Sequence, residues 1–260
     1  MLRRDTLNTR LTTLAFTLAL AALAGCAAVP KSQRDPRDPY ESFNRGVYRF
    51  NERVDRAVLR PTARAYRRVL PQFVRTSVGN FFSNIGDVRV VVNQTLQGKL
   101  TTAYADFGRV AINTTLGLGG LLDVATEAGI EKHQEDFGQT LGWYGIPGGP
   151  YIMLPLFGPS NVRDTVGWGV DWLTDPLIYV DPGGLRYGLS GGRIVNRRAE
   201  LLDATEVLKT TLDPYQFARD AYFQRRRNLV YDGKPPLDKD DVIAPPPPAP
   251  DKPSAAPAKK

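Results

Sequence analysis

The chain has 260 residues, with 34 lysines and arginines against 27 aspartates and glutamates, one cysteine and one histidine. This length is sufficient for one large domain or two small ones, and the formal net charge of +7 makes the chain basic. A single cysteine excludes an intrachain disulfide, and one cysteine with one histidine provides too few ligands for a structural zinc site.

Residues 1–25 have the pattern of a secretory signal peptide. Arg3, Arg4 and Arg10 form a positively charged amino-terminal region, and the apolar run LTTLAFTLALAALA follows it. This run of about 14 residues is too short for a transmembrane helix, which needs about 20.

The end of this segment reads LAGC, which resembles a bacterial lipobox and places the only cysteine, Cys26, at its last position. We expect Cys26 to be lipidated and to become the first residue of the mature chain. The alternative is an ordinary signal peptide followed by a chance cysteine. Ala27 stands where an aspartate would favour retention at the inner membrane, so we expect an anchor on the periplasmic side of the outer membrane. This compartment lacks ATP and argues against a nucleic-acid partner.

Composition divides the rest of the chain into three parts. Residues 26–38 are short, polar and contain prolines, so they predict a lipidated tether. Residues 39–232 show helical periodicity and predict the folded body. Residues 233–260 are rich in proline and alanine without periodicity, and we expect this tail to be disordered.

The first predicted helix of the body covers residues 38–61 and ends at Pro61. Apolar residues recur at spacings of three and four along one of its faces: Phe43, Val47, Phe50, Val54 and Val58.

Similar spacing predicts helices at residues 74–98, 102–116, 161–175, 193–211 and 213–230. Arg193 or Asn196 would stand near the start of the fifth helix in this series, and Asp213 would cap the last one. Only the region from Tyr151 to Leu156 suggests a strand, so the predicted fold class is mainly α.

Residues 137–162 contain no aspartate, glutamate, lysine or arginine. The run is long enough to cross a bilayer, but its many glycines and prolines exclude a continuous spanning helix. Its aromatic residues suit the boundary between membrane and water. Two interpretations remain open: an interfacial or re-entrant loop, or a buried glycine-rich crossing in the core of a soluble helical domain.

The sequence contains little that points to catalysis. Residues 188–192 read GLSGG and match the G-x-S-x-G nucleophile elbow, but the only histidine, His133, precedes Ser190 and no convincing strand leads into it. We interpret the match as a coincidence in a glycine-rich loop. A periplasmic hydrolase that uses Ser190 is therefore the weakest hypothesis.

The remaining charged motifs do not form an evident site. We interpret His133 as a solvated surface residue and the arginines at 225–227 as a helix end that faces solvent or phosphate groups. The acidic pair Glu135 and Asp136 has no evident partner for acid–base chemistry. Nucleotide-binding motifs are absent from the sequence, and we expect no enzymatic activity, no metal and no cofactor.

Several separated motifs resemble the MlaA/VacJ family of outer-membrane lipoproteins. They are DPYESFNRGVYRFN (38–51), RPTARAYRRVLP (60–71), VGNFFSNI (78–85), INTTLGLGGLLDVA (112–125), EDFGQTLGWYGIPGGPYIMLPLFGPSNVRD (135–164) and DPYQFARDAYFQRRR (213–227). The resemblance covers about residues 38–231 and leaves out the proline-rich tail.

The resemblance implies a ring-like helical bundle seated in the inner leaflet of the outer membrane, with the Gly/Pro-rich segment lining a channel. It implies that the protein removes mislocalised phospholipids from the outer leaflet and passes them to a periplasmic carrier for retrograde transport, which maintains lipid asymmetry. The implied partners are phospholipids, trimeric porins and the carrier. The alternative is a scaffolding lipoprotein that binds porins or envelope proteins without moving lipid.

The charge-free run and the resemblance together give candidate site residues. Phe43 and Asn44, near the start of the first helix, are gating candidates. The membrane-facing or channel-lining candidates are Trp143, Tyr144, Tyr151, Ile152, Leu154 and Phe157.

Overall fold

The computed structural model describes residues 35–208 and 211–236. The predicted signal peptide, Cys26 and residues 237–260 of the predicted tail lie outside the described residues. Residues 35–38, which the sequence assigned to the tether, belong to the folded body. Asp38 is buried and accepts hydrogen bonds from the Asn44 side chain at 2.8 Å and from the Tyr215 hydroxyl at 2.5 Å.

The body consists of helices and one small hairpin. In chain order the elements are α2 (Glu41–Val54), η2 (Asp55–Leu59), α3 (Arg60–Val69), α4 (Gln72–Leu96), α5 (Leu100–Thr115), α6 (Val124–Glu127), α7 (Phe137–Trp143), β1 (Tyr151–Leu154), β2 (Gly158–Asn161), α8 (Val162–Thr174), η3 (Pro176–Tyr179), α9 (Gly183–Glu200), α10 (Leu202–Leu208) and α11 (Pro214–Val230).

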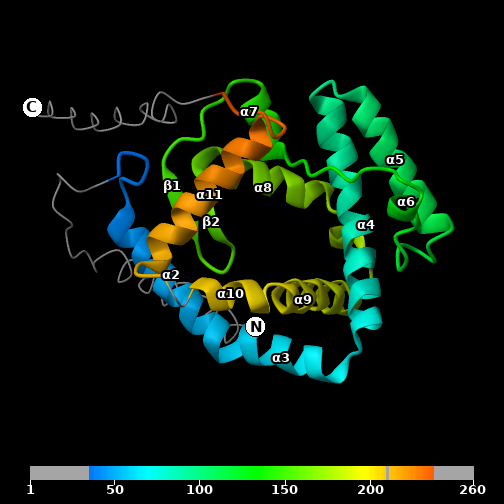
Figure 1. The fold of residues 1–260 in the computed structure, drawn as a ribbon, viewed down its shortest axis with the longest axis horizontal. Helices are drawn as coiled ribbons and strands as arrows, with labels where there is room; N and C mark the ends of the chain where they lie inside the picture. Colours follow the sequence, from blue (N-terminus) through cyan, green and yellow to red (C-terminus); the bar gives the residue numbers. More distant parts are fainter. Residues whose placement is uncertain (1–34, 209–210, 237–260) are drawn as a thin grey trace, which may run out of the picture.

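Figure 1 shows these elements arranged as a ring. Helices α3 and α9 pack along one side, α4 forms the next, α8 lies across from α9, and α11 with the hairpin closes the ring. Helix α5 packs against the outer side of α4. The prediction of a mainly α, ring-like body is confirmed.

The first predicted helix does not end at Pro61. Helix α2 runs into η2, a π-helical turn in which the Arg60 N–H donates to the Asp55 carbonyl, and α3 continues through Pro61. In a regular α-helix a proline lacks one N–H donor and its ring collides with the carbonyl four residues earlier. The wider turn of a π-helix relieves this conflict, so the chain stays helical to Val69.

The helix predicted at residues 193–211 is divided into α9 and α10, and α9 already begins at Gly183. Asn196 is therefore not a cap; it is buried inside α9 and accepts a hydrogen bond from the Tyr66 hydroxyl at 2.8 Å. Residues 188–192 lie within α9 rather than in a loop, so Ser190 does not stand on a strand-to-helix elbow.

The interpretation of His133 as a solvated surface residue is also wrong. Its Nδ1 lies 2.9 Å from a carboxylate oxygen of Asp106, which is buried between α4 and α5 and accepts a second hydrogen bond from Gln94 at 2.8 Å. The histidine thus ties the segment after α6 to the α4–α5 pair.

Strands β1 and β2 pair as an antiparallel hairpin, with Tyr151 opposite Asn161 and Leu154 opposite Gly158. The predicted strand region is therefore confirmed. In Figure 1 the hairpin lies on the inner side of the ring, next to α2 and α11, and its turn extends toward the centre.

The distribution of side chains is the reverse of that in an ordinary soluble domain. Among the described residues, buried polar and charged residues outnumber buried hydrophobic ones, and fully buried side chains include Arg109 and Asp106. All three tryptophans are largely exposed, at 49% for Trp143, 44% for Trp168 and 56% for Trp172. Extensive exposed apolar surface marks a region that contacts a membrane or another protein.

The apolar face predicted for the first helix belongs to this exposed surface, because Phe43, Phe50 and Val58 are exposed. Within the described part of the chain, no helix combines the length and apolar composition that crossing a membrane requires.

Candidate functional site

The charge-free segment of residues 137–162 folds into three pieces: α7, an irregular glycine-rich connection, and the hairpin. Both of its ends are capped. Asp136 accepts a hydrogen bond from the Gln139 N–H at 2.9 Å and begins α7, and Asn161 accepts one from the Asp164 N–H at 2.7 Å and begins α8. These side chains satisfy amide groups that the first turn of a helix leaves free.

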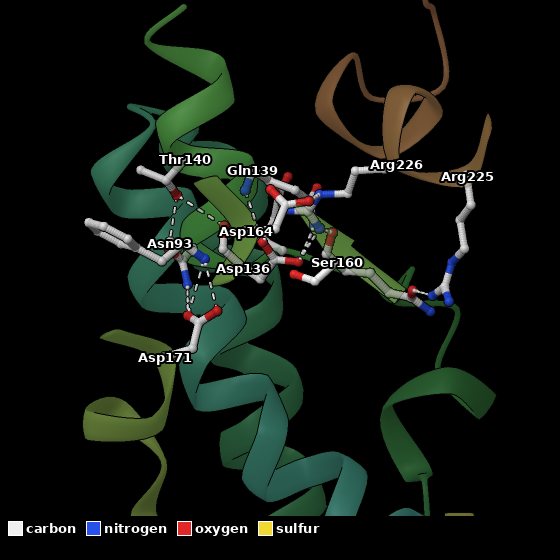
Figure 2. A network of polar contacts seen from close by, with 12 residues as sticks. Asn93, Asp136, Gln139, Thr140, Ser160, Asp164, Asp171, Arg225 and Arg226 are labelled. Atoms are coloured by element: carbon white, nitrogen blue, oxygen red, sulfur yellow. Dashed lines mark hydrogen bonds and ion pairs between the residues drawn. The ribbon is translucent and has the colours of Figure 1, made fainter. Parts of the chain in front are cut away.

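A single guanidinium joins the two ends of this segment. Arg226 of α11 donates to both carboxylate oxygens of Asp136 at 2.5 and 2.6 Å and to Asp164 at 3.0 Å. Figure 2 shows Arg226 directed toward these two carboxylates, whereas Arg225 extends away from them. The segment is therefore a loop closed by one ion-pair cluster, and this arginine is not a solvated helix end.

The electrostatics of the cluster favour its charged form. Burial alone would raise the pKa of Asp136, but the hydrogen bonds and positive charge of Arg226 and the Gln139 amides outweigh burial and lower the pKa to about 2. Burial also raises the pKa of the Tyr222 hydroxyl, as does the neighbouring Asp164, to which this hydroxyl donates at 2.5 Å. Asp136 and Arg226 therefore stay ionised at neutral pH.

A second polar network holds α7 against α4 and α8. The Thr140 hydroxyl donates to the Asn93 side chain at 2.8 Å, and Asn93 donates to Asp171 at 3.0 Å. Asp171 also accepts two hydrogen bonds from the Phe137 N–H, at 3.1 and 3.0 Å. Burial raises the pKa of Asp171, although these donors oppose the shift. Figure 2 shows this network beside α7, together with the Arg226 cluster.

Two glycines allow α7 and α8 to approach closely. A Cβ on Gly167 would lie 2.4 Å from the backbone nitrogen of Gly138, and a Cβ on Gly138 would lie 2.4 Å from the Arg226 guanidinium. Side chains at these positions would displace α7 or the arginine. The glycines of the charge-free segment thus serve packing as well as turns.

Two asparagines of α2 hold the hairpin. The Asn44 side chain donates to the Tyr151 carbonyl at 3.1 Å and accepts from the Met153 N–H at 2.9 Å. Asn51 donates to the Leu154 carbonyl at 3.0 Å and accepts from the Leu156 N–H at 2.8 Å.

The spacing of these two asparagines matches the strand that they hold. They stand two helical turns apart, about 10 Å, and this equals the rise of about three residues in a strand. Helix α2 and the hairpin therefore form one hydrogen-bonded unit, in which the buried Asn44 has a structural position.

Tyr151 is neither membrane-facing nor channel-lining, because it is fully buried. It packs in a cluster with Met153 and Tyr215, and its ring lies 5.8 Å from that of Tyr222 and 5.6 Å from that of Phe223. Successive side chains of a strand point to opposite faces, so Tyr151 and Met153 face this cluster while Ile152 and Leu154, both half-buried, face the other way.

The other aromatic candidates remain accessible. Trp143 and Tyr144, at the end of α7, are 49% and 67% exposed. Phe157, in the hairpin turn, is 63% exposed, and its ring lies 4.4 Å from that of Trp168 on α8. Phe43 is exposed on α2, close in the sequence to the buried Asn44. The structure therefore brings Asn44 together with Tyr151, and the exposed Phe43 stands next to Asn44 on α2.

A cleft of about 360 Å³ lies between the irregular connection and the end of α11. Its lining combines charged and apolar side chains. The charged ones are Arg163, Arg226 and Arg227, and the apolar ones include Ile146, Phe223 and Val230. Within the described residues, no group of three or more histidine, cysteine, aspartate or glutamate side chains is placed to hold a metal ion.

Sequence reasoning missed the residues that close the segment. Asp136 and Asp164 flank the charge-free run, one on each side. Their positions could have indicated that the two ends of the run are held by ion pairs. Nothing in the sequence identified Arg226 as their shared partner, because its contacts span 90 and 62 residues of chain. Asn51 was hidden in the same way, since its partners lie more than 100 residues away.

Comparisons with known proteins cover both the ring and this segment. A family model described as MlaA lipoprotein matches residues 36–229. The chain is 37% identical over 231 residues to the intermembrane phospholipid transport system lipoprotein MlaA of Escherichia coli (strain K12). This match covers 85% of this chain and 89% of that protein. Its identity to the protein of the same name from Haemophilus influenzae is 34% over 238 residues, or 86% of this chain and 92% of that one.

A solved structure described as the structural basis for maintenance of bacterial outer membrane lipid asymmetry is also similar. It aligns with a TM-score of 0.66 and 38% sequence identity, and the match covers 76% of this chain and 100% of that chain.

Proposed function

Because this chain belongs to the MlaA lipoprotein family, we propose that it removes mislocalised phospholipids from the outer leaflet of the outer membrane and passes them to a periplasmic carrier for retrograde transport. This transport would maintain the lipid asymmetry of the outer membrane. Such a protein makes and breaks no covalent bond, so we propose no catalytic role for any residue of the site.

The observation that carries this proposal is the reversed distribution of side chains. Burial of apolar surface contributes about 25 cal/mol per Å², and the exposed aromatic and aliphatic side chains of the ring gain this free energy only against lipid or another apolar surface. A charge at membrane depth costs about 2.5–3.5 kcal/mol or more, which accounts for the charge-free run. Both features support seating of the ring in the inner leaflet of the outer membrane.

The hairpin and the irregular connection support a role in lining a channel. Irregular backbone at membrane depth requires burial in protein or contact with a water-filled cavity. The hairpin turn extends toward the centre of the ring, and Phe157 and Leu156 are exposed there. We propose that a polar headgroup passes along the inner side of the ring while the acyl chains remain in hydrocarbon.

The anchor and the partners belong to the same proposal. We place a lipid anchor on Cys26, from which the chain to Asp35 can reach at most about 30 Å when fully extended. The body would thus remain at the membrane. Trimeric porins and a soluble periplasmic carrier are the proposed protein partners, and the exposed apolar surface provides room for the first of these.

Lipid that purifies with the protein tests whether transport or scaffolding describes it better. The chain would be purified in detergent from cells grown with radiolabelled phosphate. The control is the same anchor and tether, residues 1–34, fused to an unrelated soluble domain. We expect phospholipid in stoichiometric amount with the chain and only background with the fusion. Equal amounts with both proteins would favour the scaffolding role and contradict lipid transport.

A further inference from the structure

Helix α3 carries a basic cleft that the transport site does not use. The cleft has a volume of about 420 Å³ and is lined by Arg64, Arg67 and Arg68 together with Leu202 and Asp203 from the start of α10. Figure 1 shows α3 on the outer side of the ring, away from the charge-free segment.

One carboxylate, that of Asp203, lies against the three arginines of this cleft. Arg67 pairs with Asp203 at 2.8 Å, an aspartate whose side chain is 82% exposed. Arg64 and Arg68 are exposed and have no hydrogen-bond or ion-pair partner among the described residues. With one carboxylate against three guanidinium groups, the cleft retains an excess of positive charge.

Neighbouring sequence does not supply the missing acids. Residues 60–75 contain five arginines and no aspartate or glutamate. Like charges at positions i and i+4 of a helix, such as Arg64 and Arg68, destabilise it. An anionic ligand would offset this repulsion and would pair with the two free guanidinium groups. Phosphate oxygens match the planar, forked geometry of a guanidinium.

The residues beside the cleft indicate which anion it meets. Val69, which follows Arg68 at the end of α3, is 75% exposed, and Phe73, at the start of α4, is 71% exposed. Arginines next to exposed apolar side chains on a helix are typical of a segment at the membrane interface, where the apolar groups enter the acyl boundary and the cations meet headgroups. A site for free phosphate has no use for these apolar side chains.

We propose that the α3 cleft binds the headgroups of anionic phospholipids at the membrane surface and fixes the orientation of the ring there. This inference rests on the proposed membrane seating, but it concerns a surface that is separate from the lipid path. Each arginine near an anionic bilayer surface raises the affinity about fivefold, so the loss of Arg64 and Arg68 lowers it by more than tenfold.

The test uses the full-length chain in detergent with Val69→Cys as a site for an environment-sensitive fluorophore. The chain has a single native cysteine, Cys26, which the proposed lipidation occupies, so the new thiol is labelled selectively. The labelled protein is titrated with mixed micelles that contain phosphatidylglycerol or phosphatidylcholine. The first variant is Arg64→Glu with Arg68→Glu. The matched control is Arg49→Glu with Arg53→Glu, another exposed pair at the same spacing on α2.

We expect saturable binding of phosphatidylglycerol that is at least tenfold tighter than that of phosphatidylcholine. The α3 variant should lose this preference, and the α2 control should stay within twofold of the parent. The milder Arg64→Gln with Arg68→Gln variant, with unchanged circular dichroism, guards against a folding defect and should also lose most of the preference.

Three results would overturn the proposal: equal binding of both lipids, an equal loss in the two charge-reversed variants, or competition by millimolar inorganic phosphate. The last would indicate a free-anion site. Because phospholipid purified with the chain is measured separately, failure here leaves the proposed transport function standing.

Discussion

Replacement of Arg226 by methionine should open the charge-free segment at its base. Methionine keeps most of the apolar stem but removes the guanidinium that bridges Asp136 and Asp164. Asp136 then remains in a partly buried place without its cation, whereas Asp164 keeps its ion pair with Arg163. We expect a loss of folding stability and a looser α7, with the remainder of the ring intact.

The magnitude follows from the pKa of Asp136. Its shift from the ordinary value of 3.8 to about 2 corresponds to about 2 kcal/mol of stabilisation of the charged form. Removal of one partner of a buried ion pair typically costs about 3–5 kcal/mol, because the other charge stays uncompensated. Asp164 keeps its hydrogen bonds from Arg163 and Tyr222, so we expect a loss near the lower end, about 3 kcal/mol.

The assay is denaturant unfolding of the detergent-solubilised chain, followed by circular dichroism. The matched control is Arg225→Met, since Arg225 is exposed and, within the described residues, makes a single hydrogen bond, to Gln134 at 3.1 Å. We expect the control to change the free energy of unfolding by less than about 0.5 kcal/mol.

The pH dependence of folding stability provides an independent test, because it should have opposite directions in the parent chain and in the variant. In the parent chain the pKa of Asp136 is lowered in the folded state, so its contribution is present above about pH 4 and is lost as the pH falls toward 2. In Arg226→Met, burial without the cation raises the folded-state pKa above the unfolded one, so acidification from pH 7 to pH 4 should restore stability. Equal losses in the Arg226 and Arg225 variants, or an unchanged pH profile, would refute the role of this cluster.

Three further predictions concern the hairpin and Ser190. Asn51→Ala should cost about 2 kcal/mol and accelerate hydrogen exchange of the Leu156 amide, because two hydrogen bonds to the hairpin are lost; unchanged exchange of this amide would contradict the coupling of α2 to the hairpin. Leu154→Asp should impair membrane seating, measured by extraction of the membrane fraction at high pH, since it introduces a charge into residues 137–162; normal membrane association would count against that segment's role. Ser190→Ala should leave clearance of outer-leaflet phospholipid unchanged, because Ser190 lies inside α9; loss of clearance with a normally folded protein would revive the hydrolase hypothesis.

The sequence predicted the helices well where apolar periodicity was strong. The helices at 74–98, 102–116 and 213–230 correspond to α4, α5 and α11 within a few residues. The boundary at Pro61 failed because a proline signal assumes regular α-helical hydrogen bonds, and the π turn at Asp55–Leu59 changes them.

The candidate site was predicted as a segment but not as an arrangement. Lack of charge identified residues 137–162, and their glycines predicted an irregular path. Periodicity does not reveal which acids face which arginines across the fold, so Arg226 was taken for a solvated residue. Tyr151 was chosen as an aromatic residue of an apparent interfacial run, but its position in the strand directs it into the core.

Outer-leaflet phospholipid in living cells tests the transport function most directly. Cells that lack this protein would be compared with cells that carry a wild-type copy and with cells that carry Cys26→Ala, and surface-exposed phospholipid would be quantified by chemical labelling. We predict that phospholipid accumulates on deletion and is cleared by the wild-type copy but not by Cys26→Ala. An outer leaflet that stays unchanged on deletion would contradict phospholipid removal, and the exposed apolar surface of the ring would then require a protein partner instead.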